Sequence, residues 1–334
     1  MDIGNFSKHV LLTGAGWSRN WGARLADGVW QLLMDDPDVA ANDRLRTMLL
    51  DEPSFELALA KTQVAPFTLD DREQLSRALV NGFVSMDRAM MRPFDGSPGS
   101  INIYKVQELL FRFAGQRGQN FGTGYFFTLN QDLFPERYLY NHHPVSGAPA
   151  PALPGIQPAL GIPSFTTNIG KYSTQFIARP IPNPAASHLH GQFNVIKLHG
   201  SFNWRTADAR NLLVVGTDKT KQIADFPLLS WYSDIFKAVL FAGDVRLVIV
   251  GYGFGDEHIN AVIAEAVEKH GLKVFVWSNS DPKDRILAAP HGLAIWNGLL
   301  STVTEPMVEV FPPNQDITEE YRRIRRVVFG DQRV

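Results

Sequence analysis

The chain has 334 residues, 45% of them hydrophobic, which is enough for a sizeable buried core. Its 32 basic and 34 acidic residues leave a formal net charge of −2, so it has no general electrostatic attraction to nucleic acid or to an acidic membrane. The absence of cysteine excludes disulfides and thiolate nucleophiles, and without a signal-peptide pattern or an apolar run of ~20 residues we expect a cytoplasmic protein with no membrane partner.

The first predicted unit is a strand, a glycine-rich turn and a helix. "HVLLTGAGWSRNWG", residues 9–22, sets an apolar run directly before glycines, and "RLADGVWQLLMDD" follows with apolar residues at helical spacing. Such a turn lets the backbone approach a pyrophosphate. Gly14, Gly16 and Gly22 do not have the spacing G-x-G-x-x-G, so the turn alone leaves a nucleotide site and a tight structural turn equally open.

Two insertions interrupt the alternation of strands and helices. Residues 36–118 carry mainly helical patterns, with Thr68 as a candidate N-cap and one apolar stripe formed by Leu75, Leu79, Met86 and Met90. A helical module packed on a sheet explains that stripe. Residues 141–190 contain nine of the 21 prolines, which predicts an extended loop or lid.

Strands and helices alternate through the rest of the chain. We expect strands in "GYFFTLNQD", "FNVIKLHGSFNW", "VRLVIV", "KVFVWSNSD" and "MVEVFPP", a helix that begins at Asp256 as N-cap, and a closing basic helix in "TEEYRRIRRVVFG". This alternation predicts one α/β domain over residues 1–334, a Rossmann-like, mostly parallel sheet with helices on both faces. Ligands of such sheets bind at the carboxyl ends of the strands.

Polar residues gather at that predicted edge. Asn130 and Asp132 follow one strand, where an amide could orient a ribose hydroxyl or a water; the alternative, a turn held by Asx hydrogen bonds, is common. His199 follows another strand and could accept a proton, unless it is structural; His190 lacks a preceding strand. The second glycine cluster, "GYGFGD" at 251–256, suits a ligand with two ends.

In this order, "TGAGWS", "FTLNQD", "KLHGS" and "GYGFGDEHIN" resemble the motifs of the sirtuin-like NAD-binding family, in particular its bacterial antiphage-defence branch. The resemblance implies that the NAD diphosphate lies on the first turn, at Gly14, Ala15, Gly16, Ser18 and Gly22. It implies that Asn130 faces the nicotinamide ribose and that His199 is the general base. The other expected NAD-binding residues are Asp132, Gly251, Gly253, Asp256 and Asn279, the two glycines and Asn279 toward the adenosine half.

The departures from sirtuins also matter. Sirtuins continue the first turn as G-I-P-D-F-R, where this chain has "GARLAD", and deacetylating sirtuins carry a four-cysteine zinc ribbon that a chain without cysteine cannot form. We therefore expect no zinc and no other metal. The helical and proline-rich insertions fit better the defence branch, in which this fold hydrolyses NAD.

The leading hypothesis is an NAD+ glycohydrolase, an NAD-depleting effector of antiphage defence, with Asn130 and His199 as catalytic residues. The alternatives are a catalytically silent sensor of NAD or ADP-ribose and a sirtuin-like ADP-ribosyl or acyl transferase. Because an unregulated NADase would kill its host, the resemblance also implies a homo-oligomer or an activating partner, such as an ATPase or a guide-dependent protein. We expect no direct binding of nucleic acid.

Overall fold

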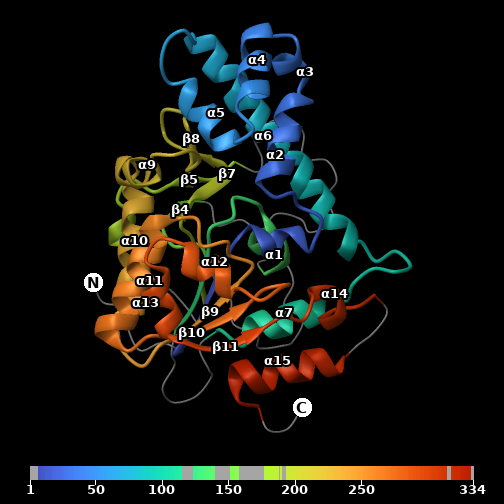
Figure 1. Ribbon diagram of the computed structural model, residues 1–334, viewed down its shortest axis with the longest axis vertical. Helices are drawn as coiled ribbons and strands as arrows, with labels where there is room; N and C mark the ends of the chain where they lie inside the picture. Colours follow the sequence, from blue (N-terminus) through green and yellow to red (C-terminus); the bar gives the residue numbers. More distant parts are fainter. Residues whose placement is uncertain are drawn as a thin grey trace.

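A computed structural model describes residues 7–114, 123–139, 151–157, 177–187, 189, 193–313 and 317–331. Its centre is a seven-stranded sheet in the order β11-β10-β9-β1-β2-β6-β3, and every pairing in it is parallel. The strands are β1 (His9–Thr13), β2 (Gly124–Thr128), β3 (Pro151–Ala152), β6 (Phe193–Lys197), β9 (Arg246–Val250), β10 (Lys273–Trp277) and β11 (Leu299–Val303). This sheet with its helices confirms the predicted α/β class (Figure 1).

The order of the strands reverses at β1. From β1 the chain forms β2, the edge strand β3 and then β6 on one side, and it returns to β9 on the other side. Thr13 at the end of β1 is in register with Thr128 of β2 and with Val250 of β9, so three strand ends lie at one level. A crevice outside such a reversal point is where open α/β sheets bind their ligands.

Helices cover both faces of the sheet (Figure 1). Leu11 of β1 lines a small apolar cavity with Leu109 and Ile324, which come from two helices on one face. On the opposite face Phe127 of β2 contacts Phe236, with ring centroids 4.9 Å apart. The covering helices are α7 (Ile103–Phe111) and α15 (Glu319–Phe329) on the first face and α10 (Pro227–Leu240) on the second, followed in the chain by α11 (Glu257–His270), α12 (Lys283–Ala288) and α13 (Gly292–Asn297). Burial on both faces explains why these strands are continuous apolar runs.

A helical module lies at one end of the molecule, drawn in blue to teal in the upper part of Figure 1. It comprises α2 (Ala26–Met34), α3 (Pro37–Ala40), α4 (Asp43–Asp51), α5 (Phe55–Lys61) and α6 (Leu69–Met91). These helices share an apolar cluster distinct from the sheet core, and the predicted stripe is buried, with Leu75, Leu79 and Met86 in this cluster and Met90 in the sheet core. The later helix α7 of segment 36–118 packs in the sheet core.

A small second sheet connects the module to the body. It pairs β7 (Gly200–Arg205) with β8 (Asn211–Leu213), and Phe83 of α6 stacks on Phe202 at 6.2 Å between ring centroids. The remaining short elements are α1 (Ala15–Arg19), η1 (Arg92–Phe94), α8 (Phe134–Tyr138), β4 (Ile156–Gln157), β5 (Arg179–Pro180), η3 (Pro184–Ala186), α9 (Lys219–Asp225) and α14 (Met307–Val310). No helix in the described part of the chain is long and apolar enough to cross a membrane.

One predicted strand is wrong. "MVEVFPP" contains the helix α14, and the last strand of the sheet is the earlier segment 299–303. Met307, Val310 and Phe311 are the buried residues, a spacing of three and four that belongs to a helix, whereas Val308 is exposed. The predicted insertion 141–190 lies mostly outside the described residues, and its described parts supply β3, β4 and β5.

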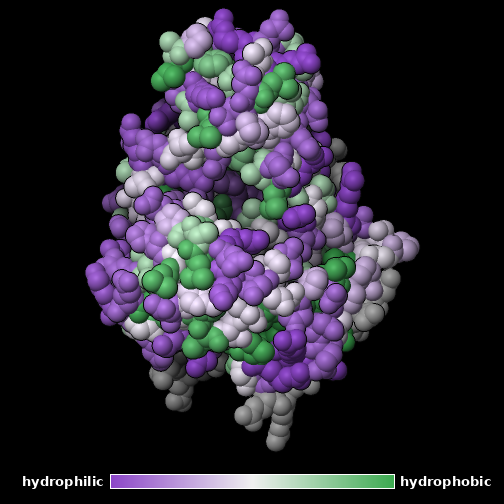
Figure 2. All heavy atoms as spheres, in the orientation of Figure 1, coloured by the Kyte–Doolittle hydropathy of each residue, from purple (hydrophilic) through white to green (hydrophobic). Residues whose placement is uncertain are grey.

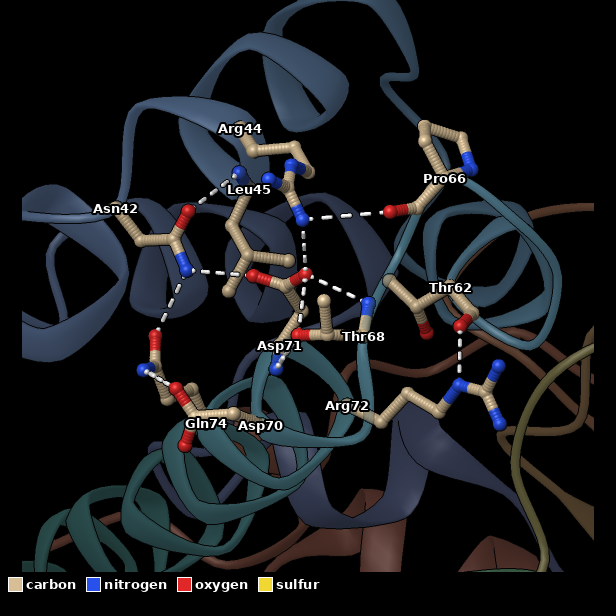
Figure 3. A network of polar contacts seen from close by, with 10 residues as sticks. All are labelled: Asn42, Arg44, Leu45, Thr62, Pro66, Thr68, Asp70, Asp71, Arg72 and Gln74. Atoms are coloured by element: carbon tan, nitrogen blue, oxygen red, sulfur yellow. Dashed lines mark hydrogen bonds and ion pairs between the residues drawn. The ribbon is translucent and has the colours of Figure 1, made fainter.

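A carboxylate joins the starts of two module helices (Figure 3). Asp71 accepts hydrogen bonds from the Thr68 backbone N–H at 2.8 Å, from Asn42 Nδ2 at 2.8 Å and from Arg44 Nη1 at 2.8 Å. Thr68 is the N-cap of α6, as predicted, and it also forms a capping box with Asp71; Asn42 is the N-cap of α4. The hydrogen bond from the Thr68 backbone is the main reason that the pKa of Asp71 lies well below its ordinary value.

Replacing Asp71 by Asn should lower the free energy of unfolding at pH 7 by about 2 kcal/mol, because an amide cannot serve all three donors. Urea denaturation measures the loss. Since the pKa of Asp71 is lowered in the folded state, its stabilisation is complete above about pH 5 and decreases in acid, so the difference from the parent protein should narrow there. Asp70→Asn, at an exposed position of the same first turn, is the control and should change stability little. An equal effect of both variants would contradict the network.

Candidate functional site

Two glycine-rich turns cross at the carboxyl ends of β1 and β9. The Gly14 N–H donates to Val250 O at 3.0 Å, and the Gly16 N–H donates to Gly251 O at 2.8 Å. A Cβ on Gly16 would lie 2.8 Å from Gly251 Cα, and one on Gly14 would lie 2.7 Å from Tyr252 Cα. The glycines are therefore needed for this backbone approach, and the approach brings the first and the later glycine motif together.

Two adjoining cavities open at this crossing. The larger, of about 550 Å³, lies toward β10 and β11, and its lining includes Gly16, Arg19, Gly251, Asn279, Arg285 and Glu305. The smaller, of about 240 Å³, lies against the helical module, and its lining includes Gly14, Phe83, Asn130, His199, Lys219 and Asp256. Both are lined by Ala15, Leu25, Ala26, Tyr252 and Gly253, so they form two chambers of one cleft. Figure 2 shows the surface hollowed between the module and the sheet body.

Ser18, Asn130 and Asp132 form a buried hydrogen-bonded chain behind the smaller chamber. Asn130 Nδ2 donates to Gly14 O at 2.9 Å and to Ser18 Oγ at 2.8 Å. Ser18 Oγ in turn donates to Asp132 Oδ2 at 2.5 Å, and Asp132 Oδ1 accepts from the Phe134 N–H. Both amide hydrogens of Asn130 are thus engaged, and no described residue donates to its Oδ1. That oxygen is the amide atom available to a ligand in the chamber that Asn130 lines.

His199 lies at the turn between β6 and β7, beside a second histidine. Its Nε2 is 3.1 Å from Nε2 of His258, which belongs to the first turn of α11. Asp256 occupies the predicted N-cap position of α11, but its side chain makes no capping bond. Its carboxylate instead accepts from Lys219 Nζ at 2.7 Å, and the same ammonium lies 2.8 Å from Glu56 of the helical module.

Burial determines the charge state of the two histidines. It lowers the pKa of His199 to about 3, against the opposing charge of Asp256. Burial also lowers the pKa of His258. Burial opposes ionisation of Asp256, but the interactions with His199 and Lys219 outweigh it and hold the pKa of Asp256 below its ordinary value. The corner therefore contains a neutral imidazole that can accept a proton and a carboxylate that would stabilise the resulting charge.

Two buried ion pairs support the segment that carries Asn130 and Asp132. Lys197 Nζ donates to the Asp132 carbonyl and lies 2.9 Å from Glu136 Oε1. Arg137 pairs with Asp87 at 2.5 Å, and both side chains are 1% exposed. Loss of one partner would leave an uncompensated buried charge, which typically costs about 3–5 kcal/mol. These pairs join α8 to β6 and to the module helix α6.

Some of the predicted site residues line the cleft, and others lie behind it or away from it. Of those expected at the NAD site, the ones that line the cleft are Gly14, Ala15, Gly16, Asn130, His199, Gly251, Gly253, Asp256 and Asn279. Ser18 and Asp132 lie behind it and contact it through Asn130. Gly22 has a positive φ of 103° and packs against the Ala89 backbone. His190 lies outside the described residues.

Several residues of the site were not predicted. His258 and Asn260 stand in the quoted "GYGFGDEHIN", so their residue types and positions were a usable signal. Asn260 is fully buried, donates to Phe254 O at 2.8 Å and is 3.0 Å from the Tyr252 hydroxyl, and it thereby fixes this turn. Lys219 and Glu56 follow no strand and belong to no motif, so the sequence carried no signal for them.

The chain matches the family model of the SIR2-like domain over residues 125–295, just over half of its length. The protein belongs to the SIR2-like family. The matched segment contains Asn130, His199 and the later glycine turn, whereas the first turn precedes it. No curated protein gives a significant match. SIR2-like domains bind NAD.

Replacing Gly16 by Ala should lower the free energy of unfolding by about 1–3 kcal/mol, because the new methyl group would collide with the Gly251 backbone. Thermal denaturation followed by circular dichroism measures this. Gly253→Ala is the matched control, since a Cβ there meets no atom within 4 Å. Equal melting temperatures for the two variants would show that the crossing is looser than described.

Proposed function

We propose that the protein is an NAD+ glycohydrolase, which cleaves NAD+ to nicotinamide and ADP-ribose. The observation that carries the proposal is that Asn130 and His199, from different strand ends, line one chamber of the cleft at the β1–β9 crossing. The two glycine turns bring the backbone close enough to hold a diphosphate between the chambers. This combination supports chemistry at the ribose of a dinucleotide.

The walls of the two chambers suit the two halves of NAD. The larger chamber offers Arg19, Arg285 and Asn279 as hydrogen-bond donors for phosphate and ribose oxygens. The smaller chamber has apolar walls from the module, at Val29, Phe55, Phe83 and Met86, opposite the polar groups at its other end. An apolar wall beside a few convergent polar groups is the usual composition of a small-molecule site. The nicotinamide ring would lie on the apolar side and its ribose near Asn130.

The reaction needs little covalent chemistry from the protein. The bond between ribose C1′ and the nicotinamide nitrogen breaks, its electron pair leaves with the ring, and nicotinamide departs neutral. The ribose becomes an oxocarbenium-like cation, and water adds to C1′ and loses a proton. Asn130 Oδ1 accepts from a ribose hydroxyl or from this water, and His199 takes the proton. Positioning and charge stabilisation would supply most of the rate.

The charges around His199 support its role as the base. A buried neutral imidazole gains a proton only if nearby negative charge stabilises the cation, and Asp256 supplies that charge. Water as the acceptor, in place of an acyl-lysine peptide, is supported by the absence of the cysteines that a zinc ribbon would need. The net products are nicotinamide, ADP-ribose and one proton.

We extend the proposal to an NAD-depleting role in antiphage defence, controlled by homo-oligomerisation or by an activating partner such as an ATPase or a guide-dependent protein. The support for this role is the resemblance of the four ordered motifs to the bacterial defence branch. Control is expected on physical grounds as well, because continuous NAD hydrolysis would exhaust the cell's own supply.

Asn130→Ala and His199→Ala should each reduce release of nicotinamide from NAD+ by at least about 100-fold, since one variant loses orientation and the other the proton acceptor. Mass spectrometry of the products, with and without the proteins encoded beside this chain, measures the effect. His270→Ala, at the far end of α11 and stacked on Phe241, should keep parental turnover. Unchanged turnover in both site variants would refute the assignment.

The product analysis also separates the alternatives. A labelled acceptor protein or an acylated ribose would identify a transferase. Tight binding of NAD+ that stays intact with every candidate partner present would identify a sensor. Either result would overturn the proposed hydrolysis.

A further inference from the structure

Three side chains beside the smaller chamber have the composition of a transition-metal site, and two of them, His199 and Asp256, line that chamber. They are His199, His258 and Asp256, whose candidate ligand atoms all lie within 4.8 Å of one another. Two imidazoles with one carboxylate are a frequent ligand set for Zn²⁺ and related divalent ions, with a further position left to water. The cluster includes the histidine that the proposed hydrolysis uses as its base.

The distance between the two imidazole nitrogens fits one shared ion. His199 Nε2 and His258 Nε2 are 3.1 Å apart. With Zn–N bonds of about 2.0–2.1 Å, two nitrogens on a tetrahedral ion lie about 3.3 Å apart. The two nitrogens are therefore already separated by nearly the distance that one shared ion requires.

The ligands come from elements that are fixed independently. His199 is buried at the end of β6, where Gly200 with its φ of 73° turns the chain into β7. His258 and Asp256 lie at the start of α11, which Asn260 and Tyr252 attach to the glycine turn after β9. A set of ligands held by separate rigid elements loses little conformational freedom when an ion binds.

The charges around the cluster also favour a cation. Lys219 lies between two carboxylates, Asp256 and Glu56, so this group of three carries a net negative charge. Lys219 donates to Oδ1 of Asp256. No described residue donates to Oδ2 of Asp256, and that oxygen remains available to an ion. Lys219 thus orients the carboxylate in the manner of an outer partner that holds a metal ligand in place.

We propose that His199, His258 and Asp256 bind one divalent transition-metal ion of the Zn²⁺ class, and that the bound ion inhibits turnover. Inhibition follows because the ion uses the Nε2 lone pair of His199, with which the imidazole would accept a proton, and occupies space next to the ribose. The inhibition rests on the proposed function, whereas the binding does not. The expectation that the chain binds no metal followed from its lack of cysteine, and this site needs none.

Metal binding is tested on the full chain after removal of metal with a chelator. We expect Co²⁺ titration to give visible absorption bands that saturate at one ion per chain, and Zn²⁺ to displace the Co²⁺. His258→Gln and Asp256→Asn should each weaken binding at least tenfold, while His270→Gln, on the same helix, should bind as the parent protein does. Undiminished binding by His258→Gln, or equal losses in His258→Gln and His270→Gln, would overturn the site.

A second measurement of metal binding, the shift in melting temperature on adding Zn²⁺, compares each protein with itself and so remains valid if a variant is less stable. Added Zn²⁺ should raise the melting temperature of the parent protein and of His270→Gln, but not that of His258→Gln, because only an intact site couples binding to folding. Equal shifts in all three proteins would indicate binding elsewhere and would overturn the assignment.

Inhibition is tested separately by nicotinamide release. Stoichiometric Zn²⁺ should suppress turnover of the parent protein, and a chelator should restore it. Turnover that Zn²⁺ leaves unchanged or stimulates would overturn the inhibition. If one Co²⁺ binds per chain but no NAD+ is cleaved, the metal site stands, and the proposed function and the inhibition are both refuted. If NAD+ is cleaved but no stoichiometric metal binds, the proposed function stands, and the metal site and the inhibition are both refuted.

Discussion

The cleft depends on the backbone contact between the turns after β1 and β9. Gly14 and Gly16 approach Gly251 and Tyr252 so closely that a methyl group at either position of the first turn would lie within 3 Å of the other turn. Because hydrogen is the only side chain that fits, the two turns can meet and still leave a chamber on each side. The reversal of strand order puts the turns side by side, and the glycines determine how close they come.

Trp17 and Trp21 explain how so short a helix can hold the first turn in place. Helix α1 has five residues, too few to be stable alone. Both indole rings are almost fully buried, contact each other edge to face at 5.4 Å and pack on Phe134. The burial of large aromatic rings anchors α1 from behind, on the side away from the cleft. The bulky residues inside a glycine-rich motif are therefore structural, whereas Ser18 between them accepts a hydrogen bond from Asn130.

The features that could be predicted from the sequence are those that depend on short-range periodicity, namely the strands and the residues at their ends. Apolar runs that end in polar or glycine residues located the strands β1, β2, β6, β9 and β10 and placed Asn130 and His199 at one edge. "MVEVFPP" failed because a four-residue helix contains too few residues to separate a period of two from one of 3.6. Lys219 and Glu56 could not be found, because their importance comes only from the three-dimensional proximity of α9, α5 and α11.

The two ion pairs of Lys219 connect the helical module to the candidate catalytic residues. Its ammonium contacts Glu56 of the module and Asp256 of the cleft at nearly equal distances, 2.8 and 2.7 Å. Burial is the main reason that the pKa of His199 is low; Asp256 raises that pKa, whereas His258 and Lys219 lower it. Because electrostatic interactions are strong where water is excluded, the position of α5, which carries Glu56, affects the charge that Lys219 presents to His199. The module is thus part of the electrostatic environment of His199 as well as a wall of its chamber.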